Sequence, residues 1–213
     1  GMTAARLAAL AARAALAGDA LAEYTRRLLA RAARYDPAGY AELDLRLCQD
    51  EPEEIQLRVL AVLLREIGGA AYQPKQEALQ EVLAGMRQAD SPRRILRRTL
   101  QGCEIAVAGA TCRVIREYAA ILERPALAPG HSLVWDGRFH VALSVTAPEN
   151  LTLGPLGPLT HDQTDRLAPG LRQRIGMGRV RATLPTLFHD QMRVGVPGYG
   201  RTADYARMRA VTS

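Results

Sequence analysis

Residues of the types that carry out catalysis are few and scattered in this sequence. Asp136 and His140 are the nearest to a pair: they stand four positions apart beside Trp135, and residues four apart in a strand share a face. A carboxylate and an imidazole placed in this way can act as an acid–base pair, so a small independent enzyme remains an open alternative. Polar residues near a strand end are more often structural or RNA-contacting, and we therefore assign no catalytic residue.

The patterns that bind metals or nucleotides do not occur. Cys48, Cys103 and Cys112 form no CxxC pair, which favours buried thiols over a disulfide framework or a zinc site. No histidine has HExxH or HxH spacing, and the sequence contains no GxxxxGK[ST], GxGxxG or SGGxDS stretch. The prolines in Gly154-Pro155-Leu156-Gly157-Pro158 remove N–H donors that a phosphate-binding loop needs. We predict no metal and no cofactor in this chain.

Membrane and secretory classes are also disfavoured. No apolar run approaches the roughly 18 residues that span a bilayer. The alanine-rich start is interrupted by Arg6, Arg13 and Asp19 and lacks the small-residue cleavage pattern of a signal peptide. We expect a cytoplasmic protein with no membrane partner.

The basic residues are concentrated in the second half of the chain. Residues 1–90 contain 11 basic and 13 acidic side chains (net −2), whereas residues 91–213 contain 17 and 9 (net +8). Lys75 is the only lysine, and the planar arginine fork is suited to phosphate and to stacking on bases. This segregation predicts a nucleic-acid partner, with the contact surface on residues 97–116 and 172–201.

Ten arginines of the second half are candidates for phosphate contacts with an RNA. They are Arg97, Arg98, Arg113, Arg116, Arg138, Arg172, Arg174, Arg179, Arg181 and Arg201. Any single one of them is more often a solvated or ion-paired side chain, so the prediction rests on the set.

The elements that would position these residues change character near residue 92. Apolar residues at helical spacing predict a helix over the first 35 residues, with Gly18 as a break. A second helix is expected after Asp50 and Glu53, spaced like a capping box, with its end at Gly68-Gly69. A third helix begins near Pro74. We predict a helical domain at residues 1–92, whose role the pattern alone does not give.

Alternating stretches follow in the second half. Residues 103–107 and 111–117 flank a glycine-containing turn and predict a β-hairpin. A strand is expected from Val134 to Val145, a short helix at 162–175, and a second hairpin hinged at His189-Asp190-Gln191. Residues 93–213 are therefore predicted to be a basic, mixed C-terminal domain, and the chain an α+β protein.

Five groups of residues occur in a characteristic order. They are Arg58-Val59-Leu60 with Gly68-Gly69 and Tyr72-Gln73-Pro74; Thr99-Leu100-Gln101-Gly102-Cys103 with Arg116-Glu117; Trp135-Asp136-Gly137-Arg138-Phe139; Gly154-Pro155-Leu156-Gly157; and Val180-Arg181-Ala182-Thr183-Leu184-Pro185-Thr186-Leu187-Phe188 with Val196-Pro197-Gly198-Tyr199. The first group resembles the middle helical domain of bacterial tRNA(Ile)-lysidine synthetases. The others resemble the post-catalytic region and terminal domain of that family.

The resemblance implies a function in tRNA modification. Full-length members of the family use ATP to adenylate the wobble cytidine of the CAU anticodon of tRNA(Ile) and then attach lysine to it. That chemistry, with ATP, Mg and lysine, belongs to an N-terminal PP-loop domain bearing SGGxDS. This sequence departs from the family there, so no catalytic residue of the family can be carried over.

The expectation is therefore an accessory chain that holds tRNA(Ile), is inactive alone, and acts with a PP-loop domain in cis or in trans. A structural or dimerisation module that does not bind RNA remains the main alternative, and a homodimer is left open.

Overall fold

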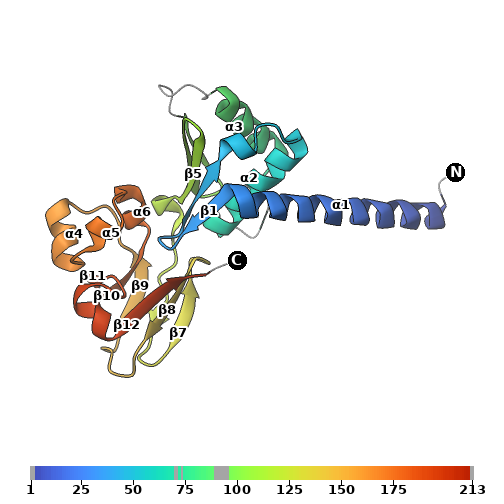
Figure 1. Ribbon diagram of the computed structural model, residues 1–213. Coiled ribbons are helices and arrows are strands. Elements are labelled where there is room, and N and C mark those ends of the chain that lie inside the picture. The colour runs from blue at the N-terminus through green and yellow to red at the C-terminus, as the bar shows by residue number, and fades with distance from the viewer. Residues whose placement is uncertain (1–2, 70–71, 73, 89–95, 212–213) are drawn as a thin grey trace.

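The computed structural model describes residues 3–69, 72, 74–88 and 96–211. Helices come first and several small antiparallel sheets follow, which confirms the predicted α+β class. Figure 1 shows two bodies, one containing α1–α3 with a sheet and the other containing further sheets with the short helices α4–α6. We call residues 3–116 the N-terminal body and residues 117–211 the C-terminal body.

Three helices and a five-stranded antiparallel sheet form the N-terminal body. In chain order its elements are α1 (Ala4–Ala32), β1 (Ala33–Asp36), β2 (Tyr40–Asp44), the 3₁₀ turn η1 (Leu45–Leu47), α2 (Glu53–Gly68), α3 (Gln76–Gln88), β3 (Leu96–Leu100), β4 (Cys103–Ala108) and β5 (Thr111–Arg116). The strand order is β1-β2-β5-β4-β3. Alternate residues of β2, β4 and β5 are buried against the helices, as expected for a sheet with one covered face.

The hydrophobic cores divide near residue 116, whereas the sequence predicted a division at residue 92. β1 and β2 lie within the segment predicted to be helical, and β2 pairs with β5 from Tyr40↔Ile115 to Asp44↔Thr111. One buried cluster consequently runs from Leu28 to Val114. The five-residue alternation of β2 is too short to be recognised locally, because its stability comes from partners about 70 residues away. Residue 92 itself lies outside the described residues.

In α2 the signal predicted for the C-terminal end is observed and the one predicted for the N-terminal end is not. Its apolar stripe is buried, and Gly69 ends it with a left-handed φ of 64°, as predicted. The capping box is not present, because the N-cap is Pro52, which has no side-chain cap bond. A proline with φ near −52° is already preorganised for the start of a helix.

The first helix is longer and less covered than the others. α1 continues through Gly18 without the predicted break, since its many alanines favour helix strongly. Only its C-terminal end, including Leu28 and Leu29, is buried, while Leu7 and Leu10 are exposed, and Figure 1 shows the helix projecting from the body. Among the described residues, no helix has the length and apolar character needed to cross a membrane.

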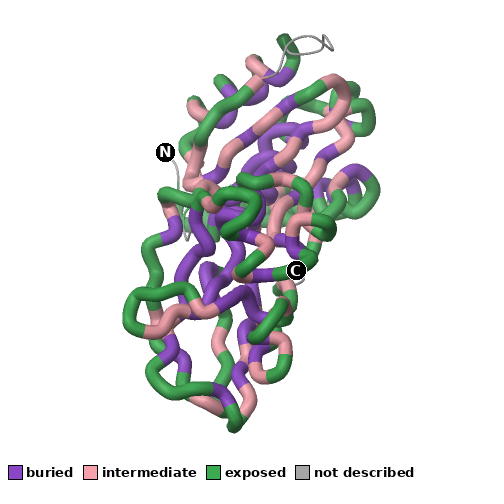
Figure 2. Tube along the Cα trace, turned by 90° about the vertical axis from the view of Figure 1, so that its left-hand side faces the viewer, coloured by how far each residue is buried: buried purple, intermediate pink, exposed green. Residues whose placement is uncertain are grey.

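Two further sheets and three short helices form the C-terminal body. Its elements are η2 (Tyr118–Ala120), β6 (Ala126–Leu127), β7 (Ser132–Trp135), β8 (Phe139–Leu143), β9 (Leu151–Pro155), α4 (His161–Leu167), α5 (Leu171–Arg174), α6 (Gly178–Ala182), β10 (Pro185–His189), β11 (Met192–Gly195), η3 (Gly200–Asp204) and β12 (Ala206–Ala210). The strand orders are β11-β10-β9-β6 and β12-β8-β7. Figure 2 shows buried segments continuing from one body into the other.

The C-terminal predictions are partly confirmed. β4–β5 and β10–β11 are the two predicted hairpins. The strand expected from Val134 to Val145 is instead the β7–β8 hairpin, because Asp136 and Gly137 both adopt left-handed φ values and reverse the chain. The helix expected at 162–175 is divided into α4 and α5 around Pro169, consistent with the lack of an N–H in proline.

The three cysteines lie in the interior as free thiols. Burial raises the pKa of Cys48 to about 11 and the pKa values of Cys103 and Cys112 to about 12. Because the thiolate is the reactive form, we expect a maleimide at about pH 8 to label the native protein on the order of 10³-fold more slowly than an exposed cysteine with pKa near 8.5. Unfolding in guanidinium chloride should restore fast labelling at all three, which mass spectrometry measures. Fast labelling of the native protein would contradict this burial.

Candidate nucleic-acid interface

Two of the predicted RNA-contacting arginines are instead parts of a buried ion triad. Arg116, at the end of β5, donates from Nη2 to Asp136 Oδ1 at 3.0 Å, and Arg138 donates from Nε to Asp136 Oδ2 at 2.8 Å. Arg116 is 8% exposed, Asp136 7% and Arg138 4%. Burial lowers the pKa of Arg138, and the neighbouring Asp136 carboxylate opposes that effect. Neither guanidinium is free to meet a phosphate.

The triad connects segments that are distant in the sequence. Arg116 also donates to the carbonyl oxygens of Gly102 and Ala120. Arg138 donates to the carbonyl oxygens of Gly39, in the β1–β2 turn, and Thr183, after α6. These bonds satisfy most of the arginine donors, which a buried charge requires. The triad therefore fixes the C-terminal body against the N-terminal sheet.

Asp136 is not available as the carboxylate of an acid–base pair with His140, because it belongs to this triad. Both oxygens of Asp136 accept hydrogen bonds from arginine, whereas His140 lies near the start of β8, opposite Val134 and Arg209. No hydrogen bond between Asp136 and His140 is present among the described residues. Within the same part of the chain, no three His, Cys, Asp or Glu side chains are grouped so that they could hold a metal ion.

Five more predicted arginines have internal partners. Arg97 and Arg179 both pair with Glu104, and Arg113 pairs with Glu42 across the β2–β5 ladder at 2.6 Å. Arg172 pairs with Asp165 at 2.7 Å. Arg181 is buried and donates to the carbonyl oxygens of Ile175 and Gly176. Exposed pairs of this kind exchange easily for other partners, so Arg97, Arg113, Arg172 and Arg179 remain candidates, while Arg181 does not.

Three exposed arginines belong to segments that meet near Tyr199 and Gly200. The guanidinium of Arg174 lies 5.7 Å from the centre of the Tyr199 ring, and Arg201 follows two residues later. The end of α4 packs on the same place, because a Cβ on Gly200 would meet Pro169 and the carbonyl oxygen of Leu167. Arg166 belongs to that end of α4.

We call Arg166, Arg174 and Arg201 the C-terminal arginine group. All three are exposed, and none has a carboxylate partner within the described part of the chain. Arg174 and Arg201 were predicted from the sequence. Arg166 was not, because the end of α4 meets their segment only through the packing of Leu167 and Pro169 on Gly200. Arg98 on β3 is likewise exposed but lies in the other body.

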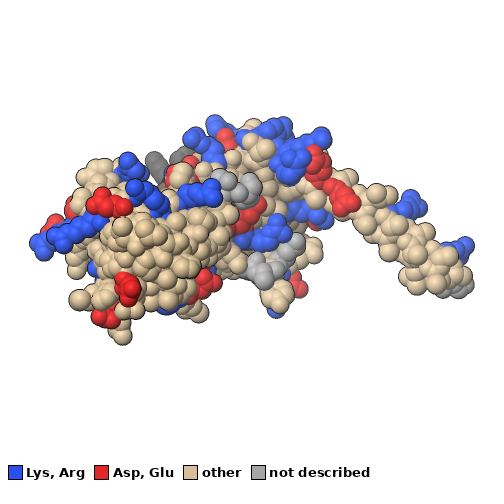
Figure 3. Space-filling view, turned by 90° about the horizontal axis from the view of Figure 1, so that it is seen from below, with Lys and Arg blue, Asp and Glu red and all other residues tan. Residues whose placement is uncertain are grey.

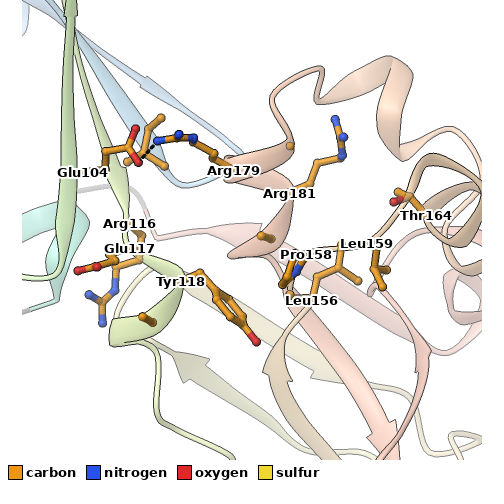
Figure 4. Close-up of a pocket in the computed structure, with 15 residues that line it drawn as sticks. Glu104, Arg116, Glu117, Tyr118, Leu156, Pro158, Leu159, Thr164, Arg179 and Arg181 are labelled. Carbon is orange, nitrogen blue, oxygen red and sulfur yellow. Dashed lines mark hydrogen bonds and ion pairs between the residues drawn. The ribbon is translucent and has the colours of Figure 1, made fainter. Parts of the chain in front are cut away.

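A cleft of about 560 Å³ separates the two bodies on one side of the molecule. Glu104, Ile115 and Arg116 line it from the N-terminal body, and residues 117–119, 156–159, 178–179 and 181–182 line it from the C-terminal body (Figure 4). The Tyr118 ring points toward Leu156 and Pro158 in this view. The lining is mostly apolar with a few charged groups at the rim, which is typical of ligand-binding clefts.

Two further arginines lie around Phe188, and one of them, Arg193, reaches the edge of this cleft. The guanidinium carbons of Arg124 and Arg193 lie 5.4 and 5.9 Å from the centre of the Phe188 ring. Arg193 also donates from Nε to the carbonyl oxygen of Leu156 at 2.8 Å. Both arginines are exposed. Neither was predicted from the sequence. Arg193 lies opposite Phe188 in the β10–β11 hairpin, and Arg124 reaches the same ring only because β6 pairs with β9 and β9 pairs with β10.

The basic side chains do not form one uniform patch. On the face shown in Figure 3 they lie mainly along one edge, over both bodies, with acidic groups among them. A single clamp made of all ten predicted arginines is therefore not what the fold builds. The candidates that are exposed and have no carboxylate partner among the described residues include the C-terminal arginine group, Arg98, and Arg124 and Arg193.

Comparison with known proteins gives three relatives. The chain is 28% identical over 182 residues to a tRNA(Ile)-lysidine synthase of Wolbachia pipientis wMel, covering 85% of this chain and 40% of that protein. It is 34% identical over 139 residues to the Ruegeria pomeroyi protein of the same name, covering 65% and 31%. The Anaplasma marginale protein of that name is 26% identical over 125 residues, covering 58% and 26%. No family model matches the chain. The chain thus spans less than half the length of the curated relatives it matches.

Proposed function

We propose that this chain, which is a distant homologue of tRNA(Ile)-lysidine synthases over most of its length, is the tRNA-binding accessory part of such an enzyme. In this proposal it acts in the cytoplasm and holds tRNA(Ile) while a PP-loop domain, in cis or in trans, uses ATP, Mg and lysine. The binding energy gained at a distance positions the reacting groups. The chain alone forms no lysidine.

The similarity over 85% of the chain to the Wolbachia protein is the observation that carries this proposal. The exposed C-terminal arginine group supports it, because guanidinium groups without carboxylate partners are available to phosphate. The charge of the surrounding segment is consistent with that role: residues 156–201 contain seven arginines and three aspartates, a net of +4.

The test is the affinity of the chain for a tRNA(Ile) transcript with a CAU anticodon, measured by fluorescence anisotropy from about 50 to 200 mM salt. If about four phosphates are contacted, the logarithm of the association constant should fall with the logarithm of salt concentration with a slope of roughly −3 to −4. Absence of binding at the lowest salt would contradict the proposal and favour the structural or dimerisation alternative. Lysidine formation by this chain alone, with ATP and lysine, would contradict the accessory assignment.

A further inference from the structure

The cleft between the two bodies has no role in the proposal above. Its lining contains one exposed aromatic ring, Tyr118, which is 39% exposed although it lies beside apolar Leu156 and Leu159. A tyrosine that neither fills a core nor donates a hydrogen bond among the described residues leaves one ring face available for stacking. Stacking on such a face is how proteins hold unpaired bases.

Cationic groups stand next to this ring. A Cβ on Gly157 would lie 3.1 Å from an Nη atom of Arg193 and 3.2 Å from the Tyr118 hydroxyl. Both side chains therefore pack beside Gly157 and are neighbours of each other. Arg124 lies against Gly154 in β9, on the side of Phe188. Neither arginine has a carboxylate partner in the described residues, and both guanidinium groups are near Phe188.

The two glutamates that line the cleft, Glu104 and Glu117, do not repel an anion bound beside Tyr118. Glu104 is compensated by Arg97 and Arg179. The Glu117 side chain points away from Leu156 and Leu159 in Figure 4, whereas Tyr118 points toward them. The apolar residues and the Tyr118 ring therefore lie on one side of the cleft, and Arg193 adjoins them at Gly157.

We propose that this cleft holds one unpaired nucleotide of a bound RNA, with the base on the Tyr118 ring and the adjoining phosphate at Arg193. A volume of about 560 Å³ is within the roughly 300–1,000 Å³ of small-ligand sites and too small for a base-paired helix. Gly157 admits both side chains, since its left-handed φ of 77° and the lack of a Cβ leave the room that they occupy. This inference rests on the proposed RNA-binding function.

The experiment compares two RNAs that differ only in an unpaired segment. One is a blunt-ended hairpin and the other is the same hairpin with a short single-stranded 3′ extension. Anisotropy at about 0.1 M salt should show tighter binding of the extended RNA by about 5- to 150-fold, the range expected for one stacked base. Tyr118→Ala should abolish this difference, and Tyr118→Phe should retain it, because the ring and not the hydroxyl is required.

Two further variants complete the test. Arg193→Ala should reduce the advantage of the extended RNA by roughly tenfold, the loss expected for one charge-assisted hydrogen bond. Tyr24→Ala is the matched control: Tyr24 is 46% exposed on α1, far from the cleft, and its replacement should leave the difference intact.

The outcomes separate the two proposals. Equal affinity for both RNAs would overturn the cleft proposal while the RNA-binding function stands, and so would an equal loss on both RNAs in Tyr118→Ala. Failure to bind either RNA or the tRNA transcript would overturn the proposed function, and the cleft proposal with it.

Discussion

Asp136→Asn is expected to lower the free energy of unfolding by about 3–5 kcal/mol, the range for breaking one side of a buried ion pair. The substitution keeps the shape of the side chain but leaves the guanidinium groups of Arg116 and Arg138 without their shared anion. Both are at least nine-tenths buried, so water cannot replace the carboxylate. With total stabilities of about 5–15 kcal/mol for natural domains, this single change removes a large share. Urea unfolding monitored by tryptophan fluorescence measures it, since the only tryptophan, Trp135, precedes Asp136.

Asp190→Asn is the matched control for this prediction. Asp190 also lies in a hairpin turn with a left-handed φ, 46° against 50° for Asp136, and asparagine tolerates that conformation well. Its carboxylate is exposed and contacts only His189 among the described residues, so we expect a change within about 0.5 kcal/mol. Equal unfolding midpoints for the two variants would show that the triad contributes no more than a surface group.

A double-mutant cycle with Arg116→Met separates the ion pair from general packing. Once Asp136 is neutral, Arg116 has already lost its partner, so removing its charge should cost less than it does in the native protein. Additive effects would mean that the two side chains act independently, against the geometry of the triad.

The simultaneous replacement of Arg166, Arg174 and Arg201 by alanine is expected to weaken binding of the tRNA(Ile) transcript by about 100-fold near 0.15 M salt. Each lost phosphate contact should also make the log–log salt dependence shallower by roughly 0.7 to 0.9. The fold should survive, because all three side chains are exposed and the Arg174–Tyr199 contact contributes only about 0.5–1 kcal/mol.

The control removes the same charge from the other body. Arg26, Arg27 and Arg58 are paired with Glu23 and Glu54 at the surface of α1 and α2. Their replacement by alanine changes the net charge by the same amount. If both triple variants lose affinity equally, the effect is long-range electrostatics and the C-terminal arginine group is not a contact surface.

Local patterns in the sequence were sufficient for the elements whose stability is local. The apolar stripe of α2 and the glycine at its end predicted a helix that is observed, and the β4–β5 and β10–β11 hairpins follow from alternation around short turns. The β1–β2 hairpin was missed because its partner strand β5 is about 70 residues away. The resemblance to tRNA(Ile)-lysidine synthetases was also available from the residues alone, and the comparisons confirm it as distant homology.

Burial was decided by the tertiary structure, and burial determines what each arginine can do. By sequence, Arg116 and Arg138 do not differ from Arg174, since all are arginines in a basic half. Packing of the β7–β8 turn against the end of β5 places the first two around Asp136 and leaves the third exposed. The same guanidinium group is a structural tie where water is excluded and a candidate phosphate contact where it is not. Residue types and net charge determined that this protein has cations to offer an RNA, and only the fold, by choosing which of them stay in solvent, determined where.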